Sequence, residues 1–244
     1  MHIVFYGDSL TKGTPGIPFL RVLGPMMPQH KLTNLGRGGD TVVSLCRRIV
    51  RSAAHESPDL AVLWIGVNDV LGTISWSHSA LKWLMRQPRA RSLHEFREAY
   101  DRILSCLRSS AQAILTVSPF LIGEDLSNPW NQRLEELSAI IESASAPYRC
   151  VEYVNLRDAL TQNGSWREPS DYIPKSVTRI GLESLCLRRP EGVDKVASHR
   201  GLRLTLDGVH LNSSGAEMVA GALRRAIDAV FATKVRPLPS DDCS

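Results

Sequence analysis

Short apolar runs alternate along the chain with longer segments in which apolar residues recur every three or four positions. Val, Ile, Leu and aromatic residues dominate the short runs, as expected for parallel strands that are buried on both faces. The predicted strands cover residues 2–6, 31–35, 60–65, 113–117 and 150–155. Because helical segments separate them, the pattern predicts a doubly wound, flavodoxin-like α/β/α sandwich around a central five-stranded parallel sheet.

Three of the longer segments carry one apolar face at helical spacing, which predicts an amphipathic helix in each. These faces run over residues 93–107, 134–141 and 219–230. Each segment is preceded by residue types that favour a helix start. The predicted starts are Ser92 with Glu95, Asn128 before Pro129, and Ser214 with Glu217, the first and last of them as capping boxes.

The length of 244 residues suits one α/β domain with a single buried core, and we expect this domain to span residues 1–232. Residues 233–244 are polar and contain proline, which predicts a flexible tail. Two stretches, 72–91 and 163–200, interrupt the alternation of strands and helices. They either shape a pocket at the carboxyl edge of the sheet or decorate the surface, and their tryptophans are candidates to line such a pocket. Those tryptophans are Trp76, Trp83 and Trp166.

Composition excludes several classes of protein. No apolar run approaches the roughly 20 residues that a membrane span requires, so an integral membrane protein is not expected. The five cysteines are far apart and never form a C-x-x-C pair, so neither a zinc site nor a disulfide framework is indicated. The net charge is +4, but paired arginines such as Arg47 and Arg48 fall in helical segments and are typical of solvated faces, so nucleic acid is not an expected partner. The start of the chain has no charged leader before an apolar stretch, and we expect it to reside in the cytoplasm.

The first predicted strand runs directly into Gly7-Asp8-Ser9-Leu10. A serine hydroxyl at this point projects from the carboxyl edge of the sheet, where backbone N–H groups of the following turn can face developing negative charge. Ser9 is therefore a candidate nucleophile. A serine after a strand is by itself more often a helix cap, so the position needs support from other residues.

A second candidate signal, Asp207-Gly208-Val209-His210, precedes the last predicted helix. Three positions separate the carboxylate from the imidazole, which allows Asp207 to accept a hydrogen bond from Nδ1–H of His210. Nε2 is then free to take a proton from a serine. The D-x-x-H spacing is common by chance, and alone it more often marks a cap or a surface feature.

Polar and glycine-rich turns follow two other predicted strands. The second strand leads into residues 36–41, which include Gly38 and Gly39, and the third leads into Gly66-Val67-Asn68-Asp69. Carboxyl ends of neighbouring parallel strands converge on one crevice. Glycine lets a backbone N–H approach a substrate oxygen closely, and an asparagine amide can donate to the same oxygen. The alternative is that these residues only form a turn and a cap.

Taken together, Gly7-Asp8-Ser9-Leu10, Gly39-Asp40, Gly66-Val67-Asn68-Asp69 and Asp207-Gly208-Val209-His210 resemble the GDSL or SGNH hydrolase family in order and position, over residues 3–231. The resemblance implies that Ser9 is the nucleophile and that Asp207 and His210 complete a catalytic triad. It further implies an oxyanion hole made by Ser9 N–H, Gly39 N–H and the Asn68 side chain. No metal or cofactor is implied.

The expected function is hydrolysis of carboxylic esters through an acyl-enzyme on Ser9, with short-chain acyl or acetyl esters as substrates. Thioesters, lysophospholipids and acyl transfer to an alcohol would use the same residues, so the partner is a small-molecule, lipid or sugar ester. Two other classes stay open. An inert ligand-binding protein of the same fold would not react with a fluorophosphonate, and a nucleotide-binding domain would need the third glycine of G-x-G-x-x-G, which Gly36-Arg37-Gly38-Gly39 lacks.

Overall fold

A computed structural model describes residues 1–52, 57–73, 88–161, 170, 172 and 189–234 of the chain. Five strands form one sheet: β1 (His2–Gly7), β2 (Lys31–Gly36), β3 (Leu60–Trp64), β4 (Ala113–Val117) and β5 (Val151–Val154). Their order is β2-β1-β3-β4-β5, and every neighbouring pair is parallel. The predicted five-stranded parallel sheet is confirmed, with strand ends that differ by at most one residue from the prediction.

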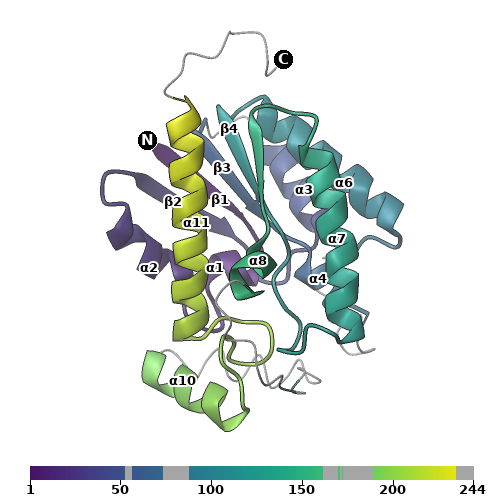
Figure 1. Ribbon diagram of the computed structural model, residues 1–244. Helices are drawn as coiled ribbons and strands as arrows, with labels where there is room; N and C mark the ends of the chain where they lie inside the picture. The colour runs from purple at the N-terminus through teal and green to yellow at the C-terminus, as the bar shows by residue number, and fades with distance from the viewer. Residues whose placement is uncertain (53–56, 74–87, 162–169, 171, 173–188, 235–244) are drawn as a thin grey trace.

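Helices cover both faces of this sheet (Figure 1). Helices α2 (Phe19–Met26), α8 (Leu156–Thr161) and α11 (Ser213–Lys234) pack together on one face. Helices α3 (Val42–Ser52), α6 (Leu93–Arg108) and α7 (Pro129–Ser145) cover the other. Helices α1 (Ser9–Lys12), α4 (Val67–Leu71) and α10 (Pro190–His199) lie at the carboxyl edge of the sheet. The result is the three-layer, doubly wound architecture that the sequence predicts.

Burial of the strands explains why the sequence predicts them correctly. All positions of β3 and β4 are buried, because helices cover both of their faces. An aromatic chain crosses the core from Phe5 through Phe19 and Trp64 to Phe120, with ring centroids 5.9, 5.5 and 6.2 Å apart. Edge strand β2 is only partly buried, which accounts for its mixed apolar and polar sequence.

Two of the three predicted helix starts are confirmed. Ser92 Oγ accepts a hydrogen bond of 3.1 Å from Glu95 N, although the Glu95 carboxylate accepts from Arg91 N and not from Ser92 N. The Asn128 side chain accepts from the backbone of Trp130 at 2.9 Å and of Asn131. Both caps satisfy N–H groups that lack a partner in the first helical turn.

The predicted capping box of Ser214 and Glu217 is wrong. Helix α11 begins at Ser213, and its cap is Asn212, two residues before Ser214. Asn212 Oδ1 accepts from Gly215 N at 2.9 Å. Ser213 N donates to Asp194 Oδ1 at 3.0 Å, so a residue of α10 satisfies another free N–H group. Asparagine is as good a cap as serine, and tertiary contacts decide between adjacent candidates.

The second predicted insertion is partly helical in its described part, since α10 falls within residues 163–200. Trp76, Trp83 and Trp166 lie outside the described residues. The predicted tail begins too early, because α11 continues to Lys234, and residues 235–244 again lie outside the described part. Within the described ranges, no helix is both long and apolar enough to cross a membrane.

Candidate active site

The residues singled out by the sequence lie where the strand order reverses. Strand β1 has β2 on one side and β3 on the other, and this switch point opens at the carboxyl ends of the strands. Ser9 follows β1, Gly39 lies in the turn after β2, and Asn68 lies on α4 directly after β3. The chain topology therefore brings these three residues to the same end of the sheet.

The turn that carries Ser9 depends on close backbone packing. A Cβ atom on Gly7 would lie 2.1 Å from Thr11 Oγ1 and 2.2 Å from the carbonyl oxygen of Trp64, so only glycine fits there. Asp8 caps α1 by accepting from Leu10 N at 2.9 Å, and Gly13 ends the helix in the left-handed conformation, with φ of 80°. Ser9 is thus the first residue of a helix that is fixed at both ends.

Ser9, His210 and Asp207 form a continuous hydrogen-bonded chain. Ser9 Oγ lies 3.0 Å from Nε2 of His210, although the two residues are 201 positions apart in sequence. Nδ1 of the same imidazole lies 2.8 Å from Oδ2 of Asp207. All three side chains are buried, with Ser9 and His210 retaining 7% and 6% exposure. The hydroxyl and imidazole are thus nearly withdrawn from bulk water.

Asp207 is held as a carboxylate by its surroundings. Burial alone raises its pKa, but the charge and hydrogen bonds of His210 and the N–H of Val209 lower it, and the net pKa lies below the usual range. Oδ1 accepts from the backbone N–H groups of Val209 at 3.1 Å and His210 at 2.9 Å, while Oδ2 faces the ring. An ionised Asp207 fixes the tautomer with hydrogen on Nδ1, which leaves Nε2 free to accept a proton.

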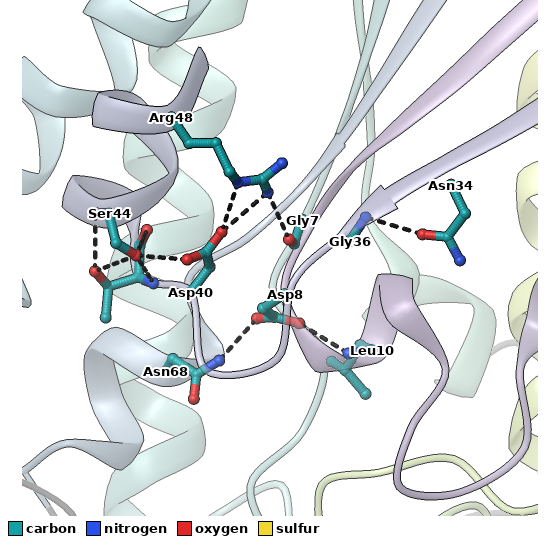
Figure 2. Close-up of polar contacts among 10 residues, drawn as sticks. Gly7, Asp8, Leu10, Asn34, Gly36, Asp40, Ser44, Arg48 and Asn68 are labelled. Atoms are coloured by element: carbon teal, nitrogen blue, oxygen red, sulfur yellow. Dashed lines mark hydrogen bonds and ion pairs between the residues drawn. The ribbon is translucent and has the colours of Figure 1, made fainter. Parts of the chain in front are cut away.

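The Asn68 amide is oriented by Asp8. Asn68 Nδ2 donates to Asp8 Oδ2 at 3.2 Å, while the other oxygen of Asp8 accepts from Leu10 N (Figure 2). Both side chains are buried. Gly39 adopts φ of 79° in the turn after β2, a conformation that favours glycine. Asn68 and Gly39 therefore flank the turn of Ser9 from two different strand ends.

An ion pair beneath this turn was missed by the sequence analysis. Arg48 donates to Oδ2 of buried Asp40 through Nε at 3.1 Å and a terminal nitrogen at 2.9 Å (Figure 2). The same terminal nitrogen donates to the carbonyl oxygen of Gly7 at 3.3 Å. The interpretation of Arg48 as part of a solvated helix face is wrong. Asp40 lies eight positions before Arg48, a separation that matches no helix or strand spacing. The two side chains meet only once the turn after β2 and helix α3 have folded, so the sequence gives no local signal of the pair.

Residues 16 and 17 meet Leu211 beside the triad. Ile17 N donates to the carbonyl oxygen of Leu211 at 2.8 Å, and a Cβ on Gly16 would lie 2.4 Å from that oxygen. The segment after α1 is therefore in direct backbone contact with the residue after His210. This contact fixes the distance between the serine turn and the loop that carries the imidazole.

The described part of the first insertion borders a hollow. Thr73 and Arg89–Arg91 line a space of about 470 Å³, which includes open solvent, together with residues of α4, α6 and α7. None of Ser9, Asp207 and His210 lines this hollow. Among the residues that the structure describes, no group of three or more His, Cys, Asp or Glu side chains could hold a metal ion.

Solved structures of similar shape cover nearly the whole chain. LAE5, an alpha/beta hydrolase enzyme from the metagenome of Lake Arreo, Spain, matches with a TM-score of 0.65 and 18% identity over 94% of this chain and 95% of its own. A catalytic mutant of Axe2, an acetylxylan esterase from Geobacillus stearothermophilus, matches with a TM-score of 0.64 and 17% identity over 93% of both chains. The acetyl xylan esterase AlAXEase matches with a TM-score of 0.63 and 21% identity over 93% of this chain and 100% of its own. At these identities the likeness shows a shared fold.

Comparison with family models is more specific. No curated protein matches the sequence. The model of the GDSL-like lipase/acylhydrolase family matches residues 5–218, a range that begins before Ser9 and ends after His210. The chain belongs to the GDSL-like lipase/acylhydrolase family and is an esterase that acts on carboxylic ester bonds.

Proposed function

We propose that the enzyme cleaves esters through a covalent acyl-enzyme on Ser9. The observation that carries the proposal is the chain of contacts from Ser9 Oγ to His210 Nε2 at 3.0 Å and from His210 Nδ1 to Asp207 Oδ2 at 2.8 Å. His210 takes the hydroxyl proton as Ser9 Oγ attacks the ester carbonyl, and then gives this proton to the leaving alcohol. Water activated by the same imidazole releases the acid and restores Ser9. Asp207 stabilises the imidazolium in both steps.

The negative charge that develops on the carbonyl oxygen needs hydrogen-bond donors on its side of the site. We assign this role to Ser9 N–H, Gly39 N–H and the Asn68 amide. Their placement at the ends of three adjacent strands supports the assignment. A buried site strengthens such hydrogen bonds, because little water competes for the donors.

We propose acetyl or short-chain acyl esters as the substrate class. Two of the structurally similar proteins are acetylxylan esterases, which supports acetylated sugars as the first candidates. Thioesters, lysophospholipids and acyl transfer to an alcohol would use the same triad and are the alternatives to be measured. Family membership supports the carboxylic ester as the bond that is cleaved. Turnover measurements must identify the acyl and alcohol parts of the substrate.

The mechanism is tested by Ser9→Ala, with Ser109→Ala as the matched control because Ser109 is an exposed serine at the end of α6. Ser9→Ala should lower turnover of p-nitrophenyl acetate by several orders of magnitude and abolish labelling by a fluorophosphonate. Ser109→Ala should leave both unchanged. Full turnover in Ser9→Ala would reject the mechanism, and a wild-type protein that neither labels nor turns over would point to an inert ligand-binding protein.

Substrate class is tested by comparing kcat/KM across p-nitrophenyl esters of increasing acyl length, with acetylated xylo-oligosaccharides, an acyl thioester and a lysophospholipid alongside. The highest value is expected for acetyl or other short acyl groups. A maximum at long acyl chains, or on the thioester, would contradict the proposed substrate class while leaving the triad intact.

A further inference from the structure

Glu124 binds the backbone segment that leads into the loop of Asp207 and His210. It lies between β4 and α7, is 3% exposed, and accepts four hydrogen bonds from three consecutive residues. Oε2 accepts from Arg203 N at 2.7 Å. Oε1 accepts from the backbone N–H of Leu204 at 2.8 Å and of Thr205 at 2.8 Å, and from Thr205 Oγ1 at 2.7 Å. One side chain thus binds a segment 79 to 81 positions away.

Further contacts carry this restraint to the imidazole. Thr205 Oγ1 accepts from Gly208 N at 3.1 Å, and Gly123 N donates to the carbonyl oxygen of Gly208 at 2.7 Å. Leu206 N donates to the carbonyl oxygen of His210 at 2.6 Å. Residues 203–210 therefore form a closed turn that is tied to residues 123 and 124 at several points. The two loops meet at the carboxyl edge of the sheet (Figure 1).

The loop that bears Glu124 is itself held in place by α7. The fully buried amide of Asn131 accepts from Ile122 N at 3.0 Å and donates to the carbonyl oxygens of Ile122, Gly123 and Asp125. Asn128 Nδ2 also donates to Ile122 O at 2.8 Å. Glu124 consequently projects from a rigid base, so its contacts with residues 203–205 restrain their position relative to the sheet.

The buried carboxylate of Glu124 needs hydrogen-bond donors, and residues 203–205 supply them. A buried carboxylate is costly unless it is paired or fully hydrogen-bonded. Within the described ranges Glu124 forms no ion pair, and backbone and hydroxyl donors of residues 203–205 satisfy it. Residues 203–205 lie outside the helices and strands, so their backbone N–H groups need other acceptors. The two carboxylate oxygens of Glu124 accept from all three of these groups.

We propose that Glu124 is a positioning residue that acts through His210. It fixes residues 203–205 so that the following turn presents Nε2 of His210 to Ser9 Oγ at hydrogen-bond distance. This inference rests on the proposed function, since it assigns Glu124 a role only in the steps that His210 catalyses. A displacement of about 1 Å at a catalytic group can cost about a hundredfold in rate.

The proposal is tested by a double-mutant cycle between Glu124→Ala and His210→Ala, assayed with p-nitrophenyl acetate at high enzyme concentration. In the chain with His210 intact, Glu124→Ala should lower kcat about ten- to a hundredfold with a much smaller change in KM. In the His210→Ala background, Glu124→Ala should change the residual rate by less than about twofold, because the group it positions is absent. Glu124→Gln keeps the acceptor atom that serves Leu204 and Thr205 and should recover part of the lost kcat.

Two controls separate positioning from loss of fold. Asp59 is also a carboxylate that accepts from backbone, at 2.7 Å from His2 N, but it lies at the opposite end of the sheet, so Asp59→Ala should leave kcat unchanged. Asn68→Ala should lower the rate by a similar factor in both backgrounds, since an oxyanion donor acts without His210. If Glu124→Ala does not fold, the cycle is run with Glu124→Gln.

An equal loss of rate from the Glu124 variant in both backgrounds, or full kcat in a folded Glu124→Ala, would overturn the proposal. Failure of the proposed function has a different result, namely an unchanged rate in His210→Ala itself. The two failures are therefore distinguishable within one set of measurements.

Discussion

Asn68 and Asp8 are joined by a hydrogen bond of 3.2 Å from Nδ2 to Oδ2 (Figure 2). An asparagine amide carries two N–H groups, and this bond occupies one of them. It also fixes which way the amide faces, because the carbonyl oxygen of Asn68 would repel the Asp8 carboxylate. Asp8 therefore sets the orientation of the amide that we propose as an oxyanion donor.

Substitution of Asp8 by Asn tests this orientation. Asp8→Asn can keep the cap on Leu10 through one oxygen, but it places an amide donor against the amide donor of Asn68. We expect kcat on p-nitrophenyl acetate to fall about ten- to a hundredfold with little change in KM, which is less than the roughly hundred- to thousandfold loss expected for Asn68→Ala. Additive losses in the double variant would show that Asp8 does not act through Asn68.

Asp207→Asn tests the role assigned to the carboxylate. The amide cannot hold His210 in the tautomer with hydrogen on Nδ1 as well as the carboxylate does, and it does not stabilise the imidazolium. We expect kcat to fall by about 10⁴-fold. Steady-state assays checked for wild-type contamination measure this loss, and a variant within about tenfold of the wild-type kcat would contradict the triad.

The lowered pKa of Asp207 also predicts a pH dependence of stability. The pKa in the folded protein lies below that in the unfolded chain, which is about 3.9, so the carboxylate stabilises the fold fully above about pH 4. This contribution is lost as the pH falls through the folded pKa. Thermal unfolding of the wild type and Asp207→Asn between about pH 3 and 7 should therefore show a difference in midpoint that is largest near neutrality and shrinks toward acid. A difference that grows toward acid would mean that the sign of the shift is wrong.

Arg48 should matter more for stability than other arginines in ion pairs. Its partner Asp40 is 1% exposed, and Arg48→Met would leave that carboxylate without its cation. We expect a loss of about 1–3 kcal/mol in the free energy of unfolding, measured by denaturant titration. Arg97→Ala is the matched control, since its pair with Asp101 is on the surface of α6 and should contribute less than about 1 kcal/mol. Equal effects would show that the buried pair has no special importance.

Substitution by alanine should have different effects at Gly36, the last residue of β2, and at Gly38, in the turn that follows. A Cβ on Gly36 would lie 2.3 Å from Lys12 N and 2.9 Å from the carbonyl oxygen of Asp8, so Gly36→Ala must push β2 away from the serine turn. A Cβ on Gly38 would meet nothing within 4 Å. We expect Gly36→Ala to lose at least about 1–3 kcal/mol of stability together with activity, and Gly38→Ala to stay within about 0.5 kcal/mol of the wild type. Thermal unfolding and turnover of the pair test this contrast.

The sheet could be predicted from the sequence because its signals are local. Strands such as β3 and β4 are buried on both faces and so consist almost entirely of apolar residues. The caps at Ser92 and Asn128 are equally local, since donor and acceptor lie within three positions. At the start of α11 two neighbouring candidates compete, and the contact of Ser213 with Asp194 of α10 decides the outcome.

The residues of the candidate site likewise fall into two groups, those with a local sequence signal and those without one. Ser9, Asn68, Asp207 and His210 were found because four short motifs occur together in one order, and the structure brings them to one edge of the sheet. Arg48 and Glu124 were missed. Glu124 contacts residues about 80 positions away, and no spacing rule relates a loop carboxylate to N–H groups at such separation. Contacts that position a catalytic group are long-range, so they become visible only in three dimensions.

The 201 positions between Ser9 and His210 have a consequence for synthesis of the chain. During synthesis, Ser9 leaves the ribosome 201 positions ahead of the imidazole that would activate it. We therefore expect Ser9 to stay as unreactive as any free serine until His210 has been made and β1 to β5 have assembled. On the proposed mechanism, reaction of Ser9 with a fluorophosphonate reports that the folded site has assembled, and we expect a nascent chain that ends before His210 not to attack esters around it.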